Sequence, residues 1–139
     1  MIAASDIRPL AVGEARTAIR VPARRQWTPL GVLARPGETF LFACQGRWWD
    51  LHIGSGPEGQ PGNCIQRQVE RLKRMRDAPW FCVIGSLGTD GKELFAIGAG
   101  GKWTNTTRRT ASLYAFANDV PGFYWNNWGV IRMEVRRTR

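Results

Sequence analysis

The sequence predicts an all-β protein, a jelly-roll-like β-sandwich that carries one helix. Seven Trp and sixteen Gly among 139 residues are typical of loop-rich β structure and not of a helical bundle. Short runs rich in β-branched and aromatic residues recur between Gly, Pro and Asn. In the last run Ile131, Met133 and Val135 alternate with charged residues, as in a strand with one face in the core. The length suits one domain with its own core.

Eight runs are predicted as strands, and each is bounded by residues that favour turns. They are Ala15–Pro22, Trp27–Ala34, Thr39–Gln45, Arg47–Ile53, Pro79–Leu87, Glu93–Gly98, Thr110–Ala117 and Gly129–Arg136. Phe40, Phe42 and Cys44 share one face of the third run. Residues 1–14 show no period, so we expect a loosely ordered N-terminal arm, followed by a single domain over residues 15–139.

One segment has the period of a helix. Ile65, Val69, Leu72 and Met75 recur at intervals of three or four residues, which predicts an amphipathic helix near residues 64–76. Its other positions carry the basic residues Arg67, Arg71, Lys73, Arg74 and Arg76. We expect this helix to lie on the sandwich with its basic surface outward, either as a solvated cover over one end or as an anion-binding or partner-binding face.

The net charge and the cysteine content limit the possible functions further. A net charge of +9 and a pI near 10.7 allow partners such as nucleic acid, heparin-like glycans or an acidic membrane surface. Three cysteines without metal-ligand spacing favour neither a disulfide framework nor a zinc site, and Cys64 is expected to be the exposed thiol. No apolar run has transmembrane or signal-peptide character, so we expect a cytoplasmic protein, or one exported without a classical signal peptide.

The stretch NDVPGFYWNNWG at residues 118–129 carries the clearest chemistry. One carboxylate, Asp119, and the amides of Asn118, Asn126 and Asn127 flank a turn at 121–122. Calcium takes about six to eight oxygen ligands from such groups and from backbone carbonyls, and a turn lets them converge. The same composition also fits a polar hairpin loop whose side chains cap their own backbone.

The pattern NDVPGxYxNNxG at 118–129 resembles the calcium loop of the PA-IL-like bacterial galactose-binding lectins. The elements PGE at 36–38 and GPEG at 56–59 are similar to two further elements of that family. The resemblance covers roughly Val21 to Val135. It is weakest in the middle third, where the predicted helix is an insertion relative to the family.

The resemblance implies a galactose-binding-domain-like sandwich and a calcium-dependent lectin for galactose-containing glycans, which binds the sugar without turning it over. The implied calcium ligands are side-chain oxygens of Asp119, Asn126 and Asn127, with backbone carbonyls from Phe123 and from the loop at or next to Asp50. Two adjacent sugar hydroxyls would complete the coordination. We expect a homo-oligomer, a dimer or a tetramer, because several weak sugar sites together gain avidity.

Other side chains are expected to contact the sugar. Asn63 and Gln66 fall at the positions of a His and a Gln of the family, and Trp125 and Trp128 replace small residues, so they either stack on the sugar or cover the site. The expected sugar-binding residues are Asp119, Val120, Asn126, Asn63, Gln66, His52, Trp49 and Trp125. His52 is the only histidine and has no catalytic partners at a telling spacing, so we do not expect an enzyme.

Two other functions stay open. One is a basic module that binds polyanions or another partner through the segment 64–76, on the same scaffold with a structural or closed calcium site. The other is an accessory domain of a toxin or assembly in which calcium only stabilises the fold.

Overall fold

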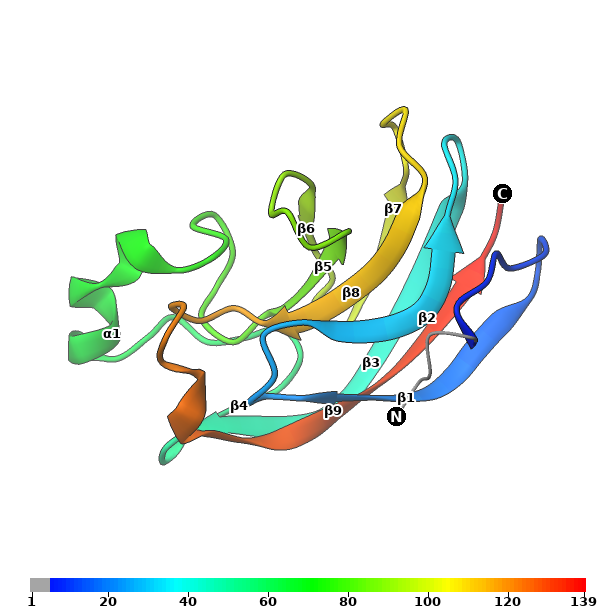
Figure 1. The fold of residues 1–139 in the computed structure, drawn as a ribbon. Helices are drawn as coiled ribbons and strands as arrows, with labels where there is room; N and C mark the ends of the chain where they lie inside the picture. The colour runs from blue at the N-terminus through cyan, green and yellow to red at the C-terminus, as the bar shows by residue number, and fades with distance from the viewer. Residues whose placement is uncertain (1–5) are drawn as a thin grey trace.

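The computed structural model describes residues 6–139, which form a sandwich of two antiparallel sheets (Figure 1). The strands are β1 Ala15–Pro22, β2 Thr28–Ala34, β3 Thr39–Asp50, β4 Ile53–Ser55, β5 Val83–Leu87, β6 Leu94–Ala96, β7 Gly100–Thr104, β8 Ala111–Ala117 and β9 Asn127–Arg137. The helix α1 spans Cys64–Gln68, and two 3₁₀ turns span Glu70–Leu72 (η2) and Tyr124–Asn126 (η3). Within the described residues, no helix is long and apolar enough to cross a membrane.

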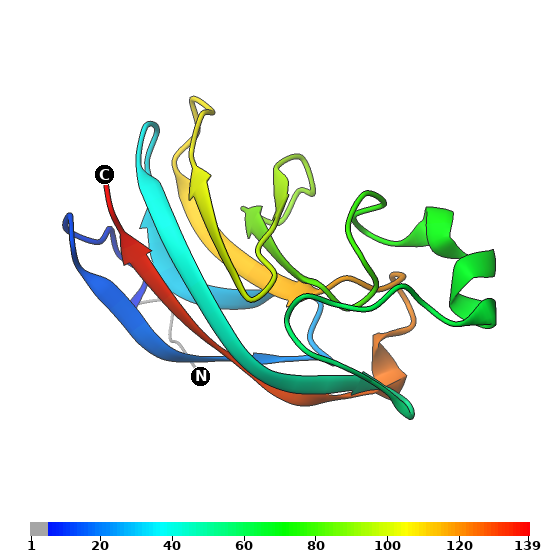
Figure 2. The same cartoon turned by 180° about the vertical axis from the view of Figure 1, so that it is seen from behind.

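The order of the first sheet is β1-β9-β3-β4, with β7 also paired to β3, and the order of the second is β2-β8-β5-β6. Figure 2 shows β7 beside β3 from behind. Ile131, Met133 and Val135 of β9 are buried between the sheets, as their alternation predicts. They share this core with Phe40 and Phe42 of β3. Burying each such side chain contributes about 1.5–3 kcal/mol, which fixes which face of each strand points inward.

β3 is one strand where the sequence predicts two, Thr39–Gln45 and Arg47–Ile53. β9 pairs with it from Phe40 to Asp50, so the ladder of hydrogen bonds passes the predicted break. Gly46 at the break has a φ of 116°, a value that glycine adopts without strain. The long pairing with β9 therefore outweighs the local turn signal of this glycine.

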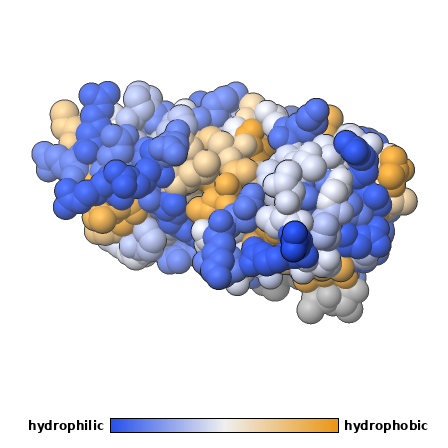
Figure 3. Space-filling view, turned by 90° about the horizontal axis from the view of Figure 1, so that it is seen from above, coloured by the Kyte–Doolittle hydropathy of each residue, from blue (hydrophilic) through white to orange (hydrophobic). Residues whose placement is uncertain are grey.

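A helix forms in the predicted segment near 64–76, as α1, but it is shorter than the pattern suggests. α1 ends at Gln68, Val69 follows with φ −113° and ψ 17°, and η2 is a separate turn. The predicted apolar face is largely exposed: Ile65 is 73% and Leu72 48% exposed, whereas Gln66 and Lys73 are buried. Figure 3 shows small orange patches among hydrophilic side chains at this end of the molecule. Gln66 and Lys73 point inward because their polar groups find hydrogen-bond partners there, Asp50 and the carbonyl of Ala78.

Residues 6–14 pack against the sandwich, although the sequence suggests a loosely ordered arm over 1–14. Leu10 is 1% exposed and belongs to the core. Arg8 forms a parallel bridge with Val32, and the amide of Gly13 donates to the carbonyl of Arg137. These contacts join the segment to both sheets, while residues 1–5 of the predicted arm lie outside the described residues.

Candidate functional site

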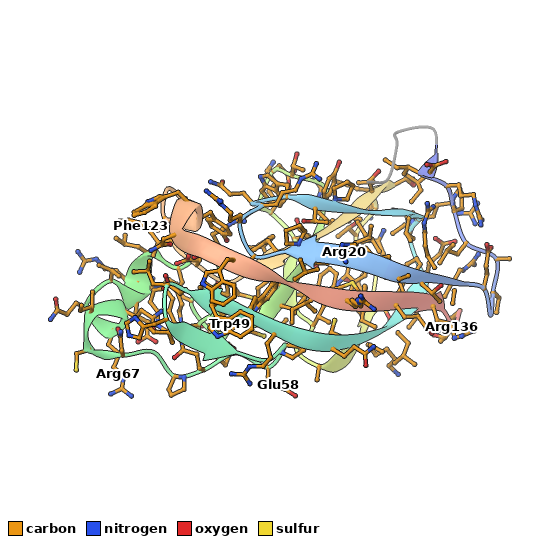
Figure 4. All side chains as sticks on the ribbon, turned by 90° about the horizontal axis from the view of Figure 1, so that it is seen from below. Arg20, Trp49, Glu58, Arg67, Phe123 and Arg136 are labelled. Atoms are coloured by element: carbon orange, nitrogen blue, oxygen red, sulfur yellow. The ribbon has the colours of Figure 1, made fainter. Side chains whose placement is uncertain are left out.

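A cavity of about 320 Å³ lies at one end of the sandwich, where three segments far apart in sequence meet. These segments are the turn after β3, α1 with the residues on either side of it, and the loop between β8 and β9, and Trp80, just before β5, adds to the lining. The sequence-predicted site residues that line it are Asp50, His52, Asn63, Gln66, Asp119, Val120, Phe123 and Asn126. Figure 4 shows Phe123 and Arg67 of α1 at this same end. The fold thus brings most of the predicted set into one place.

Asn118 anchors the β8–β9 loop and is fully buried. Its Oδ1 accepts from the amide of Met75 at 2.9 Å, and its Nδ2 donates to the carbonyls of Met75, Ala78 and Pro79. The hydroxyl of Tyr124 donates to the carbonyl of Ala117. These bonds fix both ends of the loop, so the groups between them are held in place.

Asp119 is a buried carboxylate, 3% exposed. Its Oδ1 accepts from the amide of Val120 at 2.7 Å and its Oδ2 from Nδ2 of Asn127 at 2.9 Å. Burial raises the pKa of Asp119 to about 6, and the negative charge of Asp50 adds to the rise. Within residues 6–139 no Lys, Arg or His forms an ion pair with it. A buried carboxylate of this kind favours a bound proton or cation.

Two amide oxygens beside Asp119 lack partners. Oδ1 of Asn126 and Oδ1 of Asn127 are buried and accept no hydrogen bond from any described residue. Nδ2 of Asn127 donates both to Asp119 and to the carbonyl of Ala23, which fixes the amide in one orientation. A buried acceptor without a partner costs about 1–3 kcal/mol, so two of them in consecutive residues need a reason.

Strand pairing brings Asp50 to this group. Asp50 lies opposite Asn127 on the adjacent strand, and the amide of Leu51 donates to the carbonyl of Asn126 at 3.2 Å. Leu51 has a φ of 54°, which turns the chain sharply after β3. The backbone carbonyls of this turn and the side-chain oxygens of Asn126 and Asn127 therefore lie at the same end of the sheet.

Gln66 links α1 to Asp50. Its Nε2 donates to Oδ2 of Asp50 at 2.7 Å, and its Oε1 accepts from the amide of Asn63 and from Nε2 of Gln60. Oδ1 of Asn63 in turn accepts from the amide of Gln66, which completes a capping box at the start of α1. Both residues line the cavity, but most of their hydrogen-bonding groups hold α1 and Asp50 in position.

The donor set can hold a hard cation. The described residues contain no group of three or more His, Cys, Asp or Glu placed to share a metal ion. Carboxylate, amide and carbonyl oxygens are the ligands of calcium, and the buried oxygens of Asp119, Asn126 and Asn127 are of these kinds. The amide oxygens of Asn126 and Asn127, which have no hydrogen-bond partner among the described residues, fit such an ion.

The apolar part of the lining and one of its polar groups are not predicted from the sequence. Leu51, Ile53, Ile65, Val69 and Trp80 line the cavity. Ile65 and Val69 gave a misleading signal, because their helical spacing pointed to the core. Nε1 of Trp80 is buried and donates to no described residue, and nothing in the sequence distinguishes this Trp from a core residue. The cavity therefore combines oxygen donors with apolar walls and one unused N–H.

The tryptophans expected near the sugar lie outside the cavity lining. Trp48 is buried and Trp49 is partly exposed, because adjacent residues of a strand point to opposite faces. Trp49 stacks on Trp128, with ring centroids 4.2 Å apart and planes at 8°, and Nε1 of Trp128 donates to the carbonyl of Leu51 at 2.7 Å. Figure 4 shows Trp49 on this sheet. Trp125, 66% exposed, stands on η3.

Two of the five basic residues in 64–76 are engaged within the fold. Nζ of Lys73 donates to the carbonyl of Ala78 at 2.7 Å, and the side chain is 2% exposed. The guanidinium of Arg74 lies 3.3 Å from the ring centroid of Phe116 and 4.2 Å from that of Trp27, and it donates to the carbonyl of Gln26. The exposed members are Arg67, Arg71 and Arg76. This segment therefore offers a smaller basic surface than its sequence suggests.

No protein-family model matches the chain, and no curated protein matches it in sequence. A solved structure described as "EclA N-terminal domain; PllA-like lectin" is similar, with a TM-score of 0.66 and 18% identity. The similarity covers 88% of this chain and 97% of the other. The two chains share a fold, which confirms the predicted β-sandwich. Membership of the PA-IL-like family stays a prediction.

Proposed function

We propose that this protein is a lectin that binds galactose-type sugars through a bound calcium ion and does not act on them as an enzyme. The observation that carries the proposal is the pair of buried, unpartnered amide oxygens of Asn126 and Asn127 beside the buried carboxylate of Asp119. The lectin description of the structurally similar EclA domain supports the same class of function.

Each residue has a distinct part in the proposed site. Asp119 supplies the negative charge, and Asn126 and Asn127 supply neutral oxygens that need no proton to leave. Backbone carbonyls of Phe123 and of the turn at Asp50 complete the protein's share. When bound, calcium would offer its remaining coordination positions to two adjacent sugar hydroxyls. This requirement for a correctly spaced hydroxyl pair would give selectivity for sugar stereochemistry.

The cavity walls would hold the rest of the ligand. Val120, His52 and Phe123 line the space beside the oxygen donors. Nε1 of Trp80 is a free buried donor that would bind a sugar oxygen, and sugars commonly pack their apolar faces on such walls. Gln66 and Asn63 would act mainly by positioning Asp50.

Calorimetry tests the proposal directly. A simple galactoside is titrated into the protein with millimolar calcium and again with a chelator, using wild type, Asp119→Asn and the surface control Asp77→Asn. We expect heat only with calcium, in wild type and in the control, and none in Asp119→Asn. Sugar binding that persists in the chelator or in a folded Asp119→Asn protein would contradict the proposal.

We also propose a homo-oligomer, a dimer or a tetramer, because a single sugar site of this kind is weak and several sites together raise avidity. Sedimentation velocity measures the mass in solution. A chain that stays at 15.6 kDa at micromolar concentration would exclude this part of the proposal without affecting the sugar site.

The alternative function is a basic module that binds polyanions through the segment 64–76, with calcium stabilising only the fold. The net charge of +9 favours it, whereas the engagement of Lys73 and Arg74 within the fold weakens it. Titration of a heparin-like polymer at low salt tests it, and binding should then fall steeply as salt rises.

A further inference from the structure

A second cavity, of about 210 Å³, lies at the side of the sandwich where the edge strands β1 and β2 approach each other. It is lined by Arg16, Thr17, Ala18, Ile19, Arg20, Arg25, Thr28 and Pro29. Three of these eight residues are arginines and none is acidic. The cavity shares no lining residue with the candidate calcium site. Figure 4 shows Arg20 on β1, away from the end that carries Phe123 and Arg67.

Thr28 contributes a buried hydroxyl without a partner. The residue is 4% exposed, and its Oγ1 forms no hydrogen bond with any described residue. A threonine hydroxyl buried in this way loses its bonds to water without replacement, and Val or Ile would fill a strand position of this shape at lower cost. Thr28 lines the cavity, but its Oγ1 is itself covered, so the hydroxyl reaches a ligand there only if the side chain rotates.

The three arginines of the cavity differ in how firmly their side chains are held. Arg16 is held in place, because its Nη1 donates to the carbonyls of Asp6 and Gly31 at 2.6 and 2.9 Å. Arg20 and Arg25 are exposed and can turn toward the cavity. Glu14, the carboxylate whose pKa the charge of Arg16 helps to lower, is itself bound to Arg8. Glu14 thus offsets part of the charge of Arg16, whereas the described lining residues include no carboxylate beside Arg20 and Arg25.

The backbone is irregular in both strands that line the cavity. The register of β1 against β9 shifts between Arg16 and Ile19, and Ala18 in this bulge has a φ of 56°. The register of β2 against β8 shifts between Pro29 and Leu33. Bulges of this kind redirect side chains at sheet edges, and here both edge strands carry one beside the same cavity.

We propose that this cavity binds a tetrahedral oxyanion, a phosphate or sulfate group, through Arg16, Arg20, Arg25 and the hydroxyl of Thr28. Guanidinium groups pair with such oxygens through two parallel N–H bonds, and the hydroxyl of Thr28 would donate to a third oxygen. Arg16, which is held by its two hydrogen bonds, is the fixed part of the site, while Thr28 would reach the ion by rotation of its side chain and the two exposed arginines would close on it. The site is independent of calcium and of the proposed sugar site.

Isothermal calorimetry with inorganic phosphate and with inorganic sulfate, in chelator and at low ionic strength, tests the proposal. We expect saturable binding to wild type that weakens about tenfold or more in Arg20→Gln/Arg25→Gln and in Thr28→Val. The control Arg108→Gln removes an exposed charge outside the cavity lining and should bind as wild type does. Thr28→Val should also raise the melting temperature of the ion-free protein, because the unpartnered hydroxyl is gone.

The affinities of the variants distinguish binding at this cavity from binding by net charge alone. Equal affinity in wild type, Thr28→Val and the double arginine variant, or an equal loss in Arg108→Gln, would overturn the proposal, since binding would then follow net charge alone. If Thr28→Val does not fold, the arginine pair against Arg108→Gln decides. A sulfated monosaccharide, tested in the same way, identifies the source of the oxyanion: tighter binding than sulfate places it on a sugar, and equal binding indicates a free ion.

Discussion

The proposed sugar site depends on one residue above all, Asp119, through its carboxyl group. It is buried, hydrogen bonded on both oxygens, and its pKa is raised from 3.8 to about 6, mainly by burial. Without calcium, the folded protein holds a proton at this group more tightly than the unfolded chain. Its contribution to stability is therefore full below about pH 4 and is lost as the pH rises through about 6.

Calcium should reverse this dependence, because the ion binds the carboxylate and must displace the proton. We expect the calcium-induced rise in melting temperature to be small at about pH 5 and to grow toward about pH 7. Thermal unfolding with and without calcium at both values measures it, and Asp119→Asn, which carries no titratable group here, should remove the response. Equal calcium stabilisation of wild type at both pH values would speak against Asp119 as a ligand.

The three cysteines should differ in reactivity. Cys64 is exposed at the start of α1, whereas burial raises the pKa of Cys44 to about 12 and also raises that of Cys82. Since the thiolate is the reactive form, an alkylating reagent at about pH 8 should modify Cys64 first. Mass spectrometry of peptides identifies the site, and Cys64→Ser should stay largely unmodified. Rapid labelling of Cys44 in the folded protein would contradict its burial.

At the scale of elements, the stacked pair Trp49 and Trp128 ties β3 and β9 together and holds the turn at Leu51. Trp128→Ala should lower the free energy of unfolding by about 1–3 kcal/mol, from the lost stacking and the lost hydrogen bond. It should also weaken calcium binding, because the turn that carries the carbonyl near Asp50 becomes looser. Chemical denaturation and calcium titration measure the two effects.

Two variants serve as controls for this prediction. Trp128→Phe keeps an aromatic ring but not the N–H, so its loss of stability should be smaller. Trp125→Ala removes an exposed ring and should change stability by less than about 0.5 kcal/mol. Its effect on sugar affinity decides whether Trp125 stacks on the ligand. If Trp125→Ala destabilised the fold as much as Trp128→Ala, the assigned role of the stacked pair would be wrong.

The loop after η2 supports the site through Arg74. Its guanidinium packs on Phe116 and Trp27, and its amide donates to the carbonyl of Asp119. Arg74→Ala should lower the free energy of unfolding by about 2–3 kcal/mol, whereas Arg71→Ala, on the exposed side, should change it by less than about 0.5 kcal/mol. Chemical denaturation distinguishes them. Similar effects of the two variants would mean that Arg74 acts only through its charge.

At the scale of the whole molecule, the charge of +9 should not control sugar binding. A neutral sugar that coordinates calcium releases no counterions, so its affinity should change less than about twofold between about 50 and 500 mM salt. The oxyanion site between β1 and β2 should weaken strongly over the same range, because its ligand is charged. Calorimetry of both ligands in one salt series tests this contrast. A steep salt dependence of galactoside binding would contradict the calcium-mediated mode.

Elements that depend on local sequence patterns could be predicted, whereas elements that depend on contacts between distant residues could not. The alternation of Ile131, Met133 and Val135 predicted β9 correctly, because a strand with one buried face leaves a period of two in its own sequence. Short strands such as β4 and β7 were not predicted, because three to five residues that include glycines show too little alternation to indicate a strand. For the segment 64–76 the sequence predicted a longer helix with a buried apolar face. Helical spacing does not show whether such a face packs against the rest of the protein.

The sequence by itself determined the two-sheet β fold and the oxygen donors of residues 118–129, since strand period and side-chain chemistry are local properties. Only the tertiary structure decided that Asp50 lies opposite Asn127, that Gln66 turns inward to Asp50, and that Trp49 stacks on Trp128 instead of lining the cavity. It also decided that Thr28 and the arginines of β1 share a second cavity. These relations join residues remote in the chain, so they depend on strand register and packing, which no single segment encodes.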